Sequence, residues 1–327
     1  MSLDSQTAAL LRQLGLQPDP PQVGMMEIGV HAAREGSRAV FHAYAGEGPT
    51  GCYAEDVRVP GIDRSVPARL YRPAADARPP SSMLVFLHGG GWSMGDLGCY
   101  DFFMRDLCVR SGASILSVEY RLAPEHKYPA QLDDGLAAVG WAASLTTAHA
   151  GDAARIAVMG DSAGGNLAAV IARRLHIEGR IRLAGQLLLY PMLDVSQPHA
   201  AYPSRMRYGD GEYLLTRESI DTATTWYLDG IGRRDDPDVS PLLVEDLSVL
   251  PPTVIVIGGH DPLLDEAQLY AERLRAAGVA TRFKCFATTI HAFLSFGVLD
   301  VAREGRAYLA EEIRRLLQIE RQSQAKA

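Results

Sequence analysis

The sequence has few of the features that mark metal-binding, disulfide-bonded or membrane proteins. Its 327 residues include only four cysteines, and no two of them form a C-x-x-C pair, which argues against a zinc cluster or a disulfide scaffold and fits a reducing compartment. No stretch approaches 18 apolar residues, and the N-terminus lacks the basic start and apolar run of a signal peptide. We therefore expect a cytoplasmic protein with no membrane span and no metal site.

Excess positive charge and phosphate-binding motifs are missing as well. The chain holds 32 Lys and Arg against 39 Asp and Glu, a net charge of −7, so we expect no nucleic-acid partner. Its glycine-rich turn at residues 160–165 matches neither G-x-G-x-x-G nor G-x-x-x-x-G-K-[ST], which disfavours a dinucleotide or phosphate loop. The hydrophobic content of 47% and the charged content of 22% are ordinary for a globular protein, and the length suits one large α/β domain or two smaller ones.

The most informative stretch is 155–166, which predicts a short buried strand, a tight turn and a helix. Ser162 stands at the turn in the frame Gly160-Asp161-Ser162-Ala163-Gly164, a match to G-x-S-x-G. A serine hydroxyl exposed at the top of a strand needs a sharp, strained turn, and small residues two before and two after it avoid a clash between strand and helix. The helix N-terminus beside the hydroxyl favours negative charge developing there. Taken alone, the pattern also suits an ordinary glycine-rich turn.

A second glycine-rich loop follows the apolar run 83–87, which predicts a central strand buried on both faces. The run leads into His88-Gly89-Gly90-Gly91-Trp92. Three glycines in that place let bare backbone N–H groups approach a ligand, as a main-chain oxyanion hole requires. We expect Gly89, Gly90 and Ala163 to supply the donors and His88 to hold the loop by hydrogen bonding, although the same glycines also suit a flexible turn.

Apolar segments and helical patterns alternate through the rest of the chain. Strands are expected at 83–87, 113–118, 155–160, 184–190, 253–257 and 280–286, after a hairpin over 54–73. Helices are expected at 101–112, 131–145, 163–178, 265–277 and 301–318. This alternation predicts an α/β fold with a mainly parallel central sheet and helices on both faces.

Two segments do not follow this alternation of strands and helices. Residues 1–50 carry two helical patterns separated by Pro18, Pro20 and Pro21, and residues 194–236 are irregular apart from a helical piece near 216–228. We expect these two segments to form a helical cap. The α/β catalytic domain would then comprise residues 51–193 and 237–327.

Several chemically active side chains follow predicted strands directly. His88, Ser162, Asp261 and His291 each lie just past a strand, and ligands of such sheets bind at the carboxyl ends of the strands. A serine nucleophile needs a base, and the chain order Ser162, Asp261, His291 is that of an α/β-hydrolase triad.

Two neighbouring residues compete for these roles. His260 also follows a strand, but adjacent side chains in a loop usually point apart, so it cannot readily serve beside Asp261; we favour His291 as the base. Asp265 is the alternative acid, but it is expected to begin a helix, where an acidic residue is common. We therefore favour Asp261.

At this point the sequence resembles the hormone-sensitive lipase family of α/β-hydrolases, the bacterial type IV carboxylesterases. The matching motifs occur in the family's order from about residue 54 to the C-terminus: His88–Trp92, Gly95–Leu97, Tyr120–Glu125, Gly160–Asn166, Ser240–Leu242, Asp261–Leu263 and His291–Phe293. Asp161 matches the G-D-S-A-G branch, and Gly91 and Trp92 belong to the glycine-loop motif. The resemblance implies carboxylesterase activity on short acyl esters, a two-part helical cap and no cofactor. It assigns the nucleophile, acid and base to Ser162, Asp261 and His291.

The sequence departs from the family pattern at three places, all of which affect loop packing and pocket shape. Ala292 replaces the usual glycine after the histidine, Gly98-Cys99-Tyr100 replaces the frequent Asp-Thr-His, and Gly259-His260 precedes the acid.

Other functions remain open on the sequence alone. The same triad could attack amides or pass an acyl group to an alcohol, and a non-catalytic small-ligand receptor could use the same fold. The filled triad positions favour an enzyme acting on a small-molecule ester. If the last strand, 280–286, is an exposed edge, pairing of two such edges would give a homodimer.

Overall fold

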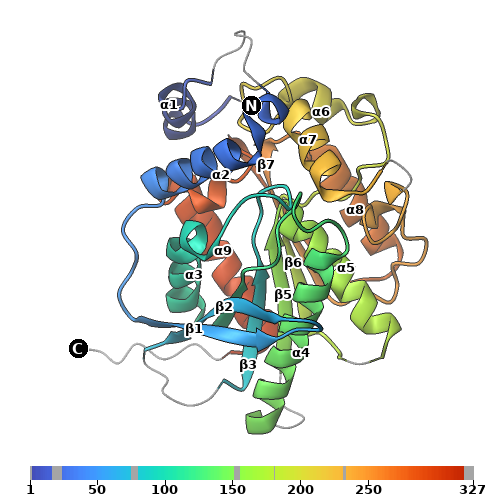
Figure 1. Ribbon diagram of the computed structural model, residues 1–327. Coiled ribbons are helices and arrows are strands. Elements are labelled where there is room, and N and C mark those ends of the chain that lie inside the picture. Colours follow the sequence, from blue (N-terminus) through green and yellow to red (C-terminus); the bar gives the residue numbers. More distant parts are fainter. Residues whose placement is uncertain are drawn as a thin grey trace.

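The computed structural model describes residues 2–16, 24–74, 80–150, 155–179, 181–230 and 233–319, which form a central sheet flanked by helices (Figure 1). In this part of the chain an eight-stranded sheet has the order β1-β2-β4-β3-β5-β6-β7-β8. The strands are β1 (Cys52–Pro60), β2 (Ser65–Pro73), β3 (Ser82–Leu87), β4 (Ser114–Val118), β5 (Arg155–Asp161), β6 (Gly185–Leu189), β7 (Thr253–His260) and β8 (Thr281–Ile290). Only β1–β2 and β2–β4 pair antiparallel, so the prediction of a mainly parallel sheet is confirmed.

Helices cover both faces of this sheet. The α-helices of the described residues are α1 (Ser5–Gln13), α2 (Met25–Tyr44), α3 (Leu97–Ser111), α4 (Ala130–Ala150), α5 (Ala163–Ile177), α6 (Pro203–Tyr208), α7 (Arg217–Tyr227), α8 (Leu264–Ala276) and α9 (Asp300–Leu317). Helices α3 and α9 lie together on one face, and α4, α5 and α8 lie on the other (Figure 1).

The sheet's centre is mainly apolar because its strands are buried from both sides. All five residues of β4 and of β6 are buried, as are five of the six in β3. Continuous apolar runs are what a parallel strand between two helical layers requires. The rigid centre therefore fixes the place of every loop that leaves its carboxyl edge.

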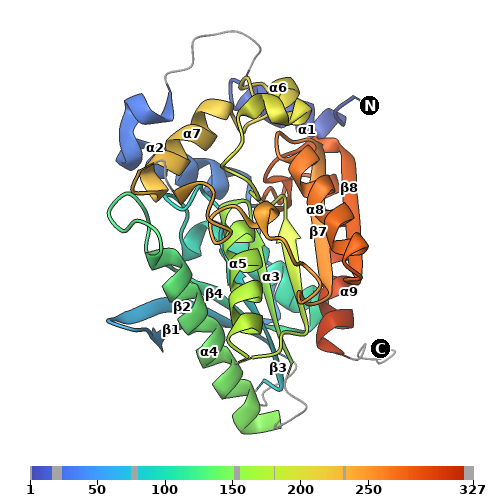
Figure 2. The same cartoon turned by 90° about the vertical axis from the view of Figure 1, so that its right-hand side faces the viewer.

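The remaining helices lie over that carboxyl edge. Helices α1, α2, α6 and α7 gather at the top of the molecule in both views (Figures 1 and 2), and α2 packs against α7. Helix α2 is interrupted at Gly29, whose φ of 79° lies outside the helical region. We propose that the described parts of residues 1–50 and 194–236 form the cap and that the rest forms the catalytic domain.

Helix α6 was not expected from the sequence. It has only six residues, with Pro203 in its first turn, so it is too short to show a helical period. Helix α7 matches the helical piece that the sequence predicts near 216–228. Across the described ranges, no helix combines the length and apolar character needed to cross a lipid bilayer.

Candidate active site

Ser162 is the single residue between the end of β5 and the start of α5. Its backbone has φ 52° and ψ −118°, a strained conformation for a residue with a side chain. Gly160 and Gly164, two residues before and two after Ser162, leave no space for a side chain. A Cβ on Gly160 would lie 2.0 Å from the Gly164 carbonyl oxygen, and one on Gly164 would lie 2.0 Å from the Leu87 carbonyl oxygen. The Ser162 N–H donates to the carbonyl oxygen of Leu189 at 2.8 Å, which helps to hold the turn.

The structure brings the three predicted triad residues into one hydrogen-bonded row. His291 Nε2 lies 3.0 Å from Ser162 Oγ, and His291 Nδ1 lies 2.8 Å from Asp261 Oδ2. A carboxylate only accepts hydrogen bonds, so Nδ1 carries the proton and Nε2 is left to accept from the serine hydroxyl. Asp261 follows the last residue of β7 and His291 follows the last residue of β8.

Both carboxylate oxygens of Asp261 take part in hydrogen bonds. Asp261 is fully buried, and its Oδ1 accepts the Leu263 N–H at 2.9 Å while Oδ2 meets His291. His291 is 5% exposed, and its ring packs edge-on to Tyr190 with centroids 4.9 Å apart. The imidazole is therefore fixed in orientation before any substrate binds.

The two competing residues lie elsewhere. The His260 ring packs against Tyr208 and Tyr213, each with ring centroids 5.4 Å away. Asp265 Oδ2 accepts the N–H of Ser204 at 2.6 Å. Neither side chain takes part in the row at Ser162.

The glycine loop departs from prediction at its first glycine. The Gly89 N–H donates to the carboxylate of Asp161 at 2.6 Å and also lies 3.1 Å from the Tyr100 hydroxyl. This N–H is already hydrogen-bonded below the loop, which disfavours Gly89 as an oxyanion-hole donor in this conformation. Gly90 and Gly91 follow with φ of 108° and 58°, conformations that favour glycine.

A buried polar group supports that loop. Asp161 Oδ1 meets Gly89, and Oδ2 accepts the hydroxyl of Tyr100 at 3.0 Å. Burial raises the pKa of Asp161 to about 7 because desolvation disfavours the charged carboxylate. Sequence reasoning missed Tyr100, which belongs to no catalytic motif and showed only as a departure from the family pattern.

His88 has the contacts expected of a residue that holds the loop. Its Nδ1 lies 2.8 Å from the Gly89 carbonyl oxygen, and its ring stacks on Tyr120 with centroids 4.3 Å apart. The Tyr120 hydroxyl donates to the His88 carbonyl oxygen at 2.6 Å. Burial lowers the pKa of His88 to about 4, so the ring is neutral at physiological pH and Nδ1 is the donor to the carbonyl.

Helices α2 and α7, which lie above the site, contact the outer part of the glycine loop. Trp92 stacks on Tyr227 of α7 with centroids 4.3 Å apart and planes 5° from parallel. Arg34 of α2 donates to the Ser93 carbonyl oxygen at 2.8 Å and pairs with Glu125. The loop is therefore supported from below by Asp161 and from above by α2 and α7.

A surface cavity of about 700 Å³ lies away from this site. Its lining includes Arg173, His176 and Leu243 and no triad residue.

Comparison with known proteins shows which family the chain resembles. Residues 84–295 match a family model described as the alpha/beta hydrolase fold. The carboxylic ester hydrolase LipN of Mycobacterium tuberculosis is 42% identical over 250 residues, covering 73% of this chain and 64% of LipN. The match therefore spans just under two thirds of LipN's length. The ethyl acetate hydrolase of Pseudomonas putida is 35% identical over 256 residues, covering 77% of this chain and 79% of that protein.

Solved structures of esterases resemble nearly the whole of this chain. A hyperthermophilic esterase from the archaeon Pyrobaculum calidifontis has a TM-score of 0.85 and 34% identity, covering 97% of this chain and 99% of that one. A thermostable esterase from Pseudomonas putida has a TM-score of 0.86 and 27% identity, covering 98% and 99%.

Proposed function

The chain belongs to the α/β-hydrolase fold family, and we propose that it is a serine carboxylesterase that hydrolyses short-acyl carboxylic esters. The observation that carries the proposal is the continuous row from Asp261 through His291 to Ser162, with contacts of 2.8 and 3.0 Å. The names of the relatives support it, since LipN is a carboxylic ester hydrolase. The name of the Pseudomonas putida relative supports a short acyl group, because ethyl acetate carries a two-carbon one.

The proposed reaction begins with attack of Ser162 Oγ on the ester carbonyl carbon. His291 Nε2 takes the hydroxyl proton, and the Asp261 carboxylate stabilises the imidazolium that forms. The tetrahedral intermediate expels the alcohol, which receives its proton from His291. Water, activated by the same imidazole, then cleaves the acyl-enzyme and releases the carboxylic acid. No step requires a cofactor or a metal.

The negative charge of the tetrahedral intermediate needs backbone donors. With the Gly89 N–H engaged by Asp161, the candidate donors are the N–H groups of Gly90, Gly91 and Ala163. Ala163 is the first residue of α5, so its N–H has no acceptor within that helix and lies at the positive end of the helix dipole. One such donor is typically worth about 10²–10³-fold in rate.

A rate comparison tests the proposal. Wild type, Ser162→Ala and the control Ser248→Ala, which changes an exposed serine, are assayed on p-nitrophenyl esters from acetate to laurate. We expect the wild type and the control to cleave the short esters equally and Ser162→Ala to be slower by about 10³-fold or more. Equal rates for Ser162→Ala and the wild type would refute the assigned nucleophile.

Other substrates distinguish the alternative functions. Faster cleavage of p-nitroanilides than of esters would make the protein an amidase. Ester-dependent acylation of an added alcohol would make it an acyltransferase. Ligand binding without turnover would make it a receptor.

We also propose that two copies pair through β8 to form a homodimer. β8 is the last strand of the sheet, so one edge faces away from β7. Within the described ranges, the N-terminal segment contacts β8 near its C-terminal end, where the Asp4 N–H donates to the Thr288 carbonyl oxygen at 2.9 Å. Residues 281–286 are the part of the edge that a second copy would pair with.

A further inference from the structure

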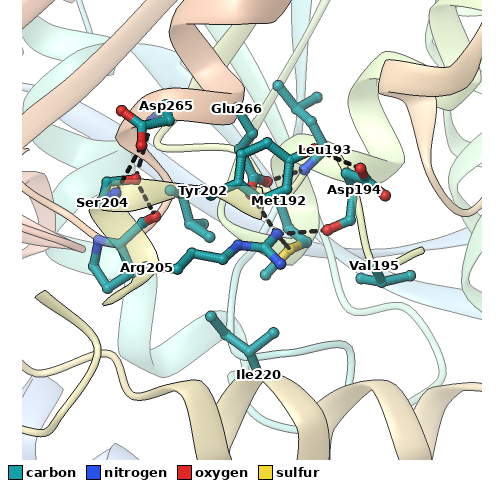
Figure 3. A network of polar contacts seen from close by, with 12 residues as sticks. Met192, Leu193, Asp194, Val195, Tyr202, Ser204, Arg205, Ile220, Asp265 and Glu266 are labelled. Atoms are coloured by element: carbon teal, nitrogen blue, oxygen red, sulfur yellow. Dashed lines mark hydrogen bonds and ion pairs between the residues drawn. The ribbon is translucent and has the colours of Figure 1, made fainter. Parts of the chain in front are cut away.

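The short helix α6 is joined to the segment that follows the proposed catalytic acid. It lies at the top of the molecule with the other cap helices (Figure 2). Figure 3 shows Ser204 and Arg205, near the start of α6, pointing toward Asp265 and Glu266 at the start of α8. Neither helix has a side-chain cap of its own at its N-cap residue, so each begins with backbone N–H groups that need acceptors.

Ser204 and Asp265 supply those acceptors to each other. The Ser204 N–H donates to Asp265 Oδ2 at 2.6 Å, and the Asp265 N–H donates to Ser204 Oγ at 3.2 Å. The Ser204 hydroxyl in turn donates to the carbonyl oxygen of Pro262 at 2.8 Å. Three hydrogen bonds therefore tie the start of α6 to residues 262–265.

The residues that Ser204 contacts, 262–265, follow the triad residue Asp261 directly in the chain. Pro262 follows Asp261 directly, and the Leu263 N–H donates to Asp261 Oδ1 at 2.9 Å. A row of contacts thus runs from Ser204 through residues 262–263 to Asp261 and on to His291. A shift of the 262–265 turn would move the carboxylate that orients the imidazole.

Arg205 makes a second attachment close by. Arg205 is 1% exposed and Glu266 0% exposed, and their side chains form an ion pair. The guanidinium also donates to the Asp194 carbonyl oxygen at 2.5 Å, while Glu266 Oε1 accepts the Leu193 N–H at 2.6 Å. Figure 3 shows this pair between α6, α8 and the loop after β6.

The loop held by this ion pair touches the nucleophile's turn. The Met192 N–H donates to the Ser162 carbonyl oxygen at 3.1 Å, and the Asn166 side chain donates to the Met192 carbonyl oxygen at 3.1 Å. Helix α6 is therefore attached, through two adjacent residues, to the loop of the acid and to the loop beside the serine.

On the basis of the proposed esterase function, we infer that Ser204 and Arg205 are positioning residues of the triad, because they fix the Asp261 turn and the loop beside Ser162 from the cap side. In this account α6 is a fixed part of the active site and does not act as a detachable lid. Its loss would change the geometry of the Asp261–His291 hydrogen bond rather than substrate affinity.

Ser204→Ala tests the inference most simply, because it removes the hydroxyl and leaves the backbone N–H. The matched control is Met206→Ala in the same helix, where the side chain is 46% exposed. We expect Ser204→Ala to lower kcat on a short p-nitrophenyl ester by about tenfold, with little change in KM, because a misplaced carboxylate stabilises the transition state less. The acidic limb of its kcat/KM profile should move to lower pH, because the imidazolium is less stabilised. Ser204→Thr, which keeps the hydroxyl, should restore both kcat and the position of the acidic limb. Met206→Ala should match the wild type in both.

A second readout does not depend on turnover. The Nδ1 proton between His291 and Asp261 should give a low-field proton NMR signal, which Ser204→Ala should move upfield and broaden while Met206→Ala leaves it unchanged. Asp265→Ala, which removes the acceptor of the Ser204 N–H at a half-buried position, should act in the same direction and serves if Ser204→Ala does not fold.

The outcomes separate this inference from the proposed function. A wild-type kcat, pH profile and low-field signal in Ser204→Ala, with or without a lower melting temperature, would overturn the positioning role even if the protein is an esterase. If the wild type cleaves no ester, the proposed function fails, but a low-field signal that moves upfield and broadens only in Ser204→Ala and Asp265→Ala would still support the positioning role of α6.

Discussion

The buried carboxylate of Asp161 should make the protein less stable as the pH rises from 4 to 7. The side chain is 1% exposed, and its two oxygens accept from the Gly89 N–H and the Tyr100 hydroxyl. Burial raises its pKa from 3.8 to about 7. Between these two values the folded protein keeps a proton that the unfolded chain has lost, so folding becomes less favourable with each step in pH.

The size of this effect follows from the pKa difference. A difference of about 3, at about 1.4 kcal/mol for each pKa unit, gives about 4 kcal/mol in the free energy of unfolding. This contribution is fully present below about pH 4 and is lost by the time the pH passes about 7. About 3 kcal/mol of the loss falls between pH 5 and pH 8.

Asp161→Asn removes the titration while keeping the shape. The amide oxygen can still accept the Gly89 N–H, and the amide NH₂ can donate to the Tyr100 hydroxyl oxygen. The free energy of unfolding is measured in urea at pH 5 and pH 8 for the wild type, Asp161→Asn and the control Asp229→Asn, whose carboxylate is exposed. We expect the wild type and the control to lose about 3 kcal/mol more than Asp161→Asn over this range.

A second buried carboxylate, that of Glu266, does not disturb this comparison. Burial also raises the pKa of Glu266 to about 7, which adds a loss of the same sign to all three proteins and cancels in the difference. Equal losses in the wild type and Asp161→Asn would refute the argument that the buried carboxylate is protonated in the folded state below pH 7.

Two further predictions concern the turn of Ser162 and the assembly. Gly160→Ala should abolish esterase activity and destabilise the fold by several kcal/mol, because the new Cβ would lie 2.0 Å from the Gly164 carbonyl oxygen; Gly140→Ala in α4, with open space at its Cβ, should be neutral or stabilising by up to about 1 kcal/mol, and urea unfolding of both variants checks this. Sedimentation equilibrium should give twice the chain mass if β8 edges pair, whereas a single chain mass at every concentration would exclude the dimer.

The sequence predicted the features that depend on local pattern and space. The apolar run 83–87 identified β3 because a strand buried on both faces admits few polar side chains. Gly160 and Gly164 identified the turn of Ser162 because only glycine fits there. The chain order of Ser162, Asp261 and His291 matched the row of contacts found at the carboxyl edge of the sheet.

The features that the sequence missed depend on contacts between distant segments. Which loop N–H faces a substrate could not be read from the three glycines, because Gly89 is engaged by Asp161, which lies 72 residues further along the chain. Helix α6 has too few residues for a period, and its start is held by Asp265 and Glu266 from another helix. Such pairings appear only once the fold is known.

The central claim is that Ser162 Oγ is the activated nucleophile, and covalent labelling tests it most directly. The protein is treated with a fluorophosphonate, which transfers its phosphonyl group to an activated serine, and intact mass and peptide mapping then locate the adduct. The account predicts one adduct per chain, on Ser162, and none on Ser162→Ala. An adduct on another residue, or equal labelling of Ser162→Ala, would contradict it.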